Sequence, residues 1–216
     1  MNTESKWVIE KTASFVRQKL ENDCTGHDSW HIYRVWHNAK KIAKKEGGSL
    51  FVVELAALLH DIEDWKFSGD EKASGKFARK FLNSLEVNIE TIEKVGQIID
   101  SVSYKGAGIK DEMVNIEGKI VQDADRLDAM GAIGIARAFA YGGSKSRQMY
   151  DPKISPVNHQ NFEQYKKNGT TINHFYEKLL LLKDRMKTHT GKKMAENDMR
   201  SWKNIWKNSI ENGKHN

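Results

Sequence analysis

The sequence predicts an all-α protein that forms a single domain over residues 1–216. Apolar residues recur at helical spacing along most of the chain, and no segment of useful length alternates as a strand does. The only two prolines, Pro152 and Pro156, lie close together, so long helices can form on either side of them. A chain of 216 residues can also bury one substantial core.

The first half of the chain is expected to hold five helices. The third of these, with the sequence FVVELAALLHDIE, is apolar on nearly all sides and is therefore expected at the centre of the fold. Gly47 and Gly48 can end the helix before it, and Ser49 can cap its first turn. The expected ranges are 5–22, 28–46, 50–62, 71–84 and 88–103.

In the second half, an irregular segment at 104–118 precedes an expected helix at 119–141, which is rich in Ala and Gly. Its small side chains indicate close packing, because each helical Gly otherwise lowers stability by about 1 kcal/mol. The polar stretch 142–169 contains both prolines and is predicted to be a lid or insertion loop over the functional site. Two further helices are expected at 171–188 and 192–211.

Composition narrows the class of protein. The single cysteine, Cys24, allows neither a disulfide framework nor a cysteine metal site, which fits a reducing cytoplasm. The N-terminus lacks the apolar core of a signal peptide, and apolar runs such as Leu179 to Leu182 are too short to span a bilayer. The net charge of +6 suits an anionic substrate or nucleic acid, although solvation alone would also explain it.

A histidine–aspartate pair, His60-Asp61, follows the apolar run of the central helix. Burying an imidazole and a carboxylate is costly unless partners compensate for the lost water. A metal ion is one such partner, since neutral imidazole and carboxylate are good ligands for Mn, Fe, Co, Ni or Zn. The alternative is a helix end that is simply exposed to water.

Two further residues favour the metal interpretation. His31 lies on an earlier predicted helix and Asp125 on a later one, so three helices could bring two imidazoles and two carboxylates to one point. Such a mixed set leaves positions open for water and for a phosphate oxygen. Asp123 and Asp128 are alternative ligands, and Asp128 could instead support Asp125 from one turn away.

Three motifs carry a resemblance to a known family. They are HDSWHIYRVWHNA at 27–39, LLHDIED at 58–64 and DADRLDAMGAIGIARAF at 123–139. Their order resembles the HD-domain phosphohydrolase superfamily, in particular stand-alone bacterial HD hydrolases similar to nucleoside triphosphate pyrophosphohydrolases. The resemblance implies a compact all-α helical bundle and one divalent metal ion (Mn, Mg, Co, Ni, Fe or Zn). It also implies ligation by His31, His60, Asp61 and Asp125.

The resemblance further implies a residue that orients or deprotonates the attacking water. Asp64 is the preferred candidate because it lies one turn after Asp61 on the same helix face, and Glu63 is its competitor. Phosphate charge needs cations, for which Arg34 and Lys66 are the first candidates. Further candidates for substrate contact are His27 and Lys105.

The expected function is therefore a metal-dependent phosphohydrolase acting on a small phosphorylated substrate, with a nucleotide as the best candidate. Cleavage of a nucleoside triphosphate to monophosphate and pyrophosphate is the first alternative, and phosphomonoester cleavage is the second. A non-catalytic, metal-stabilised nucleic-acid-binding module is the competing class, and it would show steeply salt-dependent binding without turnover. No membrane partner is expected, nucleic acid is not the favoured partner, and a homodimer is left open.

Overall fold

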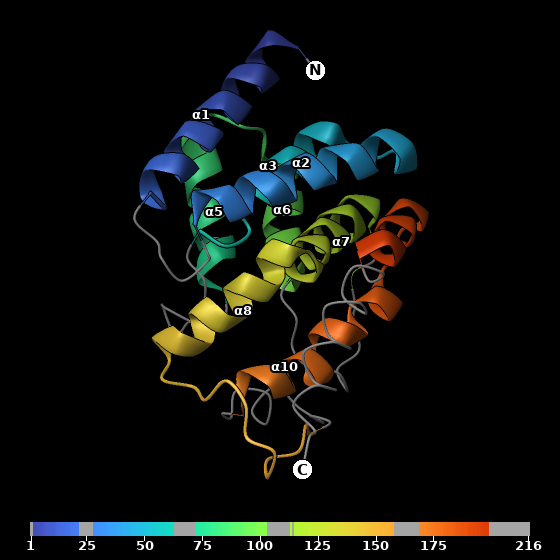
Figure 1. The fold of residues 1–216 in the computed structure, drawn as a ribbon. Helices are drawn as coiled ribbons and strands as arrows, with labels where there is room; N and C mark the ends of the chain where they lie inside the picture. The colour runs from blue at the N-terminus through green and yellow to red at the C-terminus, as the bar shows by residue number, and fades with distance from the viewer. Residues whose placement is uncertain are drawn as a thin grey trace.

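The computed structural model describes residues 2–21, 28–62, 72–102, 113, 115–157 and 169–198. Within these ranges every regular element is a helix (Figure 1), which confirms the all-α prediction. The α-helices are α1 (Thr3–Lys19), α2 (Ser29–Glu46), α3 (Leu50–Leu59), α5 (Ala73–Ser84), α6 (Ile89–Val102), α7 (Ile116–Met130), α8 (Ala132–Ser144) and α10 (Thr171–Glu177). Two short 3-10 helices, Leu179–Leu181 and Lys183–Arg185, follow α10, and residues 189–198 are again helical.

Side-chain caps define where several helices begin. Asp28 accepts a hydrogen bond from the backbone N–H of His31 at 2.8 Å, and Asn115 accepts one from Gly118 at 2.6 Å. These bonds satisfy N–H groups that the first turn of a helix cannot pair internally. At the other end of α2, Gly47 has a φ of 84° and ends the helix in a conformation that favours glycine. The expected helix boundaries at 28, 46 and 50 therefore lie within one residue of the observed ones.

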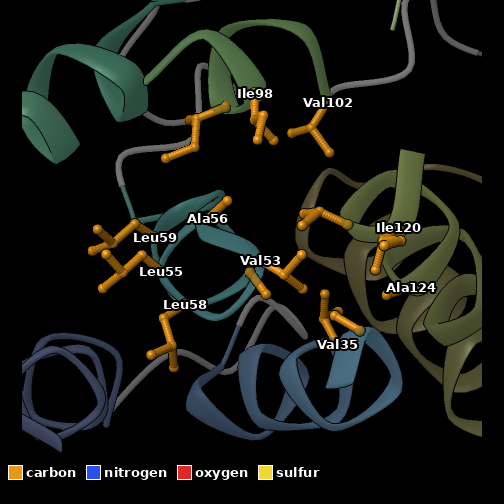
Figure 2. Packing of buried hydrophobic residues seen from close by; sticks show 14 of the residues in the cluster. Val35, Val53, Leu55, Ala56, Leu58, Leu59, Ile98, Val102, Ile120 and Ala124 are labelled. Atoms are coloured by element: carbon orange, nitrogen blue, oxygen red, sulfur yellow. The ribbon is translucent and has the colours of Figure 1, made fainter. Parts of the chain in front are cut away.

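The central helix of the bundle is α3, as its apolar sequence predicts. Every residue from Val52 to Leu59 is buried. Figure 2 looks at α3 end-on and shows its side chains meeting those of α2, α6 and α7, including Val35, Ile98, Val102, Ile120 and Ala124. Burying a Leu or Val side chain stabilises the folded state by about 1.5–3 kcal/mol, so α3 is firmly held by its neighbours. No helix in the described ranges has the length and apolar content needed to cross a membrane.

The single helix expected at 119–141 is wrong, because the structure has two helices there. Helix α7 ends at Met130, and Gly131 has extended backbone angles (φ −78°, ψ 175°) before α8 begins. Close approach requires a glycine at position 134, where a Cβ atom would lie 2.3 Å from the carbonyl oxygen of Ala129. The small residues of this stretch therefore allow two helices to meet at a sharp junction.

The helix expected at 171–188 is also wrong beyond Glu177. At Lys178 the backbone leaves the helical region (φ −139°, ψ −63°), and 3-10 turns follow. A 3-10 helix has three residues per turn, so Leu179 and Leu182 project to the same side and both are buried in the core.

The segment predicted to be a lid, 142–169, is described only in part. Its first residues extend α8 to Ser144, and residues 145–157 form turns that contact the α10 region. The backbone N–H of Thr171 donates to the backbone carbonyl of Gln148, and the side chain of Asn173 donates to the backbone carbonyl of Ile154. Residues 158–168 lie outside the described residues, so covering of the functional site stays a prediction.

Candidate metal centre

Four side chains converge on one point between α2, α7 and the end of α3. Nε2 of His31 lies 3.4 Å from Oδ2 of Asp61 and 3.7 Å from Oδ1 of Asp125. Nε2 of His60 lies 3.7 Å from each of the same two oxygen atoms. Three of the four expected ligands, His31, His60 and Asp125, have ligand atoms that all lie within 4.8 Å of one another. The fourth, Asp61, lies beside both histidines.

Local structure places each of these side chains. His31 lies in the first turn of α2, directly after the Asp28 cap, and Asp125 lies within α7. His60 is the residue that ends α3, and Asp61 follows it. Because α3 is the buried centre of the bundle, its last turn delivers the His60-Asp61 pair into the protein interior.

The cluster is buried on its histidine side and open on its aspartate side. The side chains of His31 and His60 are 0% and 1% exposed, whereas those of Asp61 and Asp125 are 15% and 33% exposed. Water and a small molecule can therefore approach the carboxylates. Catalytic metal sites need such an open position.

A hydrogen bond sets the orientation of the His60 ring. Its Nδ1 lies 2.9 Å from the carbonyl oxygen of Ala57, which can only accept, so the neutral imidazole carries its proton on Nδ1. Its Nε2 is buried and has no hydrogen-bond partner among the described residues. A buried polar atom of this kind is costly unless something else engages it.

The atoms of the cluster have the spacing that a metal ion needs. Ligand atoms about 2.0–2.2 Å from a shared ion lie roughly 3–3.6 Å from one another. The observed nitrogen–oxygen separations of 3.4–3.7 Å are close to this range, and longer than hydrogen bonds. Two imidazoles and two carboxylates form a donor set suited to a divalent transition metal, so these residues fit such an ion.

The two carboxylates also change the ionisation of His60 in the chain alone. Burial would lower the pKa of His60, but the negative charges of Asp61 and Asp125 outweigh it and raise the pKa to about 9. Burial would likewise raise the pKa of Asp125, but its contact with His60 and the charges of both histidines bring it well below its usual value. The cluster therefore attracts positive charge.

The other ring nitrogen of His31, Nδ1, contacts a third carboxylate, that of Asp128. Nδ1 of His31 lies 2.8 Å from Oδ2 of Asp128, which is itself buried. Asp128 also accepts hydrogen bonds from Nε of Arg34 at 2.6 Å and from Nη1 of Arg137 at 2.8 Å. Burial would raise the pKa of Asp128, but these hydrogen bonds and charges lower it to about 2.

These contacts correct two expectations for α7. Asp128 does not support Asp125 but contacts His31, so the imidazole of His31 lies between two carboxylates one turn apart. Asp123 is not a ligand, because its oxygens accept from the backbone of Lys187 and from both the backbone and the hydroxyl of Thr188. These bonds instead hold the residues just before the helical segment 189–198 against α7.

Arg34 is reachable from solvent. Together with Asp128 it lines a cavity of about 740 Å³ between α2, the α7–α8 junction and the last described helical residues. The exposed ring of Trp30 and the partly buried ring of Tyr33 line the same cavity. Because Arg34 already donates to Asp128, its contact with substrate phosphate stays a prediction.

The remaining expected residues lie outside the described residues. These are the two candidates for acting on water, Asp64 and Glu63, and the substrate candidates His27, Lys66 and Lys105. Their roles stay predictions.

Arg137 is the residue at this site that sequence reasoning missed. It lies on α8, nine residues after Asp128, and reaches back to it across the Gly131 break. Arg137 belongs to GIARAF, the end of the third motif that carries the family resemblance. Helical spacing alone, however, gave no reason to place Arg137 near His31.

Known proteins with related sequences identify the family. The model of the HD domain family matches residues 30–130. YpgQ from Bacillus subtilis is 38% identical over 188 residues, which cover 87% of this chain and 84% of YpgQ. The chain belongs to the HD domain family.

Solved structures agree with this membership in the HD domain family. A protein from Lactobacillus plantarum superposes with a TM-score of 0.83 at 37% identity, covering 97% of this chain and 98% of that one. An HD-superfamily hydrolase from Bacillus thuringiensis gives a TM-score of 0.73 at 42% identity, covering 98% and 100%. YpgQ from Bacillus subtilis in complex with ADP gives 0.71 at 33% identity, covering 94% and 97%.

Proposed function

We propose that this member of the HD domain family is a metal-dependent phosphohydrolase that acts on a nucleotide. One observation carries the proposal, namely the grouping of His31, His60 and Asp125 with Asp61 beside them. The four distances from a histidine Nε2 to an Asp61 or Asp125 oxygen are 3.4–3.7 Å. Relatives that include an HD-superfamily hydrolase support the hydrolase class. The partly exposed carboxylates leave room for a substrate at the centre.

The four residues would hold one divalent cation, which supplies Lewis acidity by polarising a phosphoryl oxygen and acidifying a water molecule. The chain's own residues perform the other tasks. Asp64, with Glu63 as the alternative, would accept the proton of the attacking water. Arg34, Lys66, Lys105 and His27 would contact the negative charge of the substrate.

The structure of YpgQ in complex with ADP supports a nucleotide as the substrate class. The favoured reaction is hydrolysis of a nucleoside triphosphate to a monophosphate and pyrophosphate. In it, one water adds to the α-phosphorus as the bond to the bridging oxygen breaks. Phosphomonoester hydrolysis, which releases inorganic phosphate, is the second reaction that these residues could perform.

The test is a release screen with the full-length chain stripped of metal. Nucleoside mono-, di- and triphosphates are supplied with Mn, Co, Ni, Mg or Zn, and phosphate and pyrophosphate are measured separately. We expect metal-dependent turnover that Asp61→Ala abolishes. Asp184→Ala is the matched control, since Asp184 is exposed on the second 3-10 helix and should leave turnover unchanged.

Two results would contradict the proposal. One is the absence of product with every metal and nucleotide, combined with salt-sensitive binding to nucleic acid, which is the behaviour of a binding module. The other is full turnover by Asp61→Ala, which would place the chemistry elsewhere. Release of phosphate from nucleoside monophosphates, without pyrophosphate from triphosphates, would keep the phosphohydrolase and select the phosphomonoesterase.

A further inference from the structure

We propose that Asp128 is a positioning residue for the metal centre: it holds the His31 imidazole in its ligating orientation, and Arg34 and Arg137 hold Asp128 in place. This inference rests on the proposed function, because it assumes that His31 binds a metal ion. It concerns three residues behind the cluster, namely Asp128 and the two arginines that donate to it.

The first step concerns the proton on the His31 ring. An ionised carboxylate can only accept hydrogen bonds, so the 2.8 Å contact between Asp128 and Nδ1 of His31 requires the proton to lie on Nδ1. The Nε2 lone pair is then directed toward the Asp61 and Asp125 oxygens. A hydrogen bond to the far nitrogen commonly sets the tautomer and ring orientation of a metal-ligating histidine.

The second step concerns how Asp128 is kept in position. Its Oδ1 accepts from Nε of Arg34, and its Oδ2 accepts from Nη1 of Arg137 as well as from His31. The Asp128 side chain is only 4% exposed, so its negative charge depends on these cations rather than on water. Nη1 of Arg137 also lies 2.9 Å from Nδ1 of His31, and both nitrogens lie 2.8 Å from the same Asp128 oxygen.

The third step concerns the break between α7 and α8, which lets Arg137 reach Asp128. Asp128 lies in the last turn of α7, and Arg137 lies in the second turn of α8. A continuous helix would place residue 137 about 13 Å further along the axis, beyond reach of Asp128. The break at Gly131 and the tight contact of Gly134 with Ala129 fold α8 back, so that Arg137 reaches the carboxylate.

Asp123 provides a matched comparison on the same helix. It is a fully buried aspartate in α7 and accepts several hydrogen bonds, as Asp128 does, but they come from Lys187 and Thr188. Asp123→Asn should therefore disturb local structure without reaching His31. Asp128→Asn preserves side-chain shape, removes the negative charge and acts on His31 directly.

The experiment measures metal affinity in place of turnover. Metal-stripped full-length chains are titrated with Co²⁺ against a chromophoric chelator, and the visible spectrum of bound Co²⁺ is recorded. We expect Asp128→Asn to raise the Kd about 10- to 100-fold and to alter the spectrum. Asp123→Asn should keep the wild-type Kd and spectrum, even where its melting temperature falls.

Equal Co²⁺ affinity and an equal spectrum in Asp128→Asn and wild type would overturn the inference while leaving the proposed function intact. Wild-type protein that binds no Co²⁺ would overturn both. If Asp128→Asn fails to fold, Arg137→Gln replaces it, with an expected rise in Kd of roughly tenfold. An unchanged Kd in a folded Arg137→Gln variant would likewise count against the inference.

Discussion

Raising the pH from 7 to 9 should tighten metal binding about 50-fold. Burial alone would lower the pKa of His60, but Asp61 and Asp125 raise it to about 9 in the chain alone. Ligation needs the neutral ring, and at pH 7 only about one molecule in a hundred would have it. The apparent Kd should therefore fall about tenfold from pH 7 to 8 and about fivefold from pH 8 to 9. At pH 7, binding should release about one proton from His60.

The assay determines the Kd with chelator-buffered free metal at pH 7, 8 and 9. Calorimetry in two buffers of different ionisation enthalpy counts the protons released. A Kd that does not change between pH 7 and 9, or binding without proton release at pH 7, would refute the electrostatic reasoning.

The stability of the metal-free chain should change in the opposite direction. The folded-state pKa of His60 is raised from 6.5 to about 9, so protonated His60 stabilises the fold fully below pH 6.5. This contribution is lost as the pH rises through 9. The melting temperature should therefore fall between pH 7 and 9 without metal, whereas saturating metal should reverse the trend.

Two substitutions test the packing. Leu58→Ala removes a fully buried side chain from α3 and should lower the free energy of unfolding by about 2.7–5 kcal/mol in urea titrations. The control Leu181→Ala, at an exposed position, should cost less than about 1 kcal/mol. Gly134→Ala should destabilise the protein because its Cβ would clash with Ala129, and a gain of about 1 kcal/mol from better helix propensity would contradict the observed junction.

The sequence was sufficient to predict the elements that depend on local patterns. The all-round apolar character of 50–62 predicted the buried central helix, and Gly47, Gly48 and Ser49 marked the end of α2 and the start of α3. The convergence of His31 with the His60-Asp61 pair and Asp125 was also expected, because each residue lies on a helix that periodicity could define.

Features that depend on three-dimensional contacts were not predictable in the same way. The spacing of Asp125 and Asp128 indicated a mutual contact, but the ring of His31 lies between them and interacts with one through each nitrogen. The turn at Gly131 depends on how closely Gly134 can approach Ala129, which no periodicity reveals. Arg137 therefore could not be placed beside Asp128 before the α7–α8 junction was known.

The wide separation of the clustered residues along the chain has a consequence for how the protein can be studied. His31 and its partner Asp128 are 97 positions apart, so no short peptide contains the centre. An ion with affinity only for the native arrangement adds about 2.7 kcal/mol of stability at a hundred times its Kd. The fraction of chains that bind metal would then measure the fraction that is correctly folded, and this measurement needs no substrate.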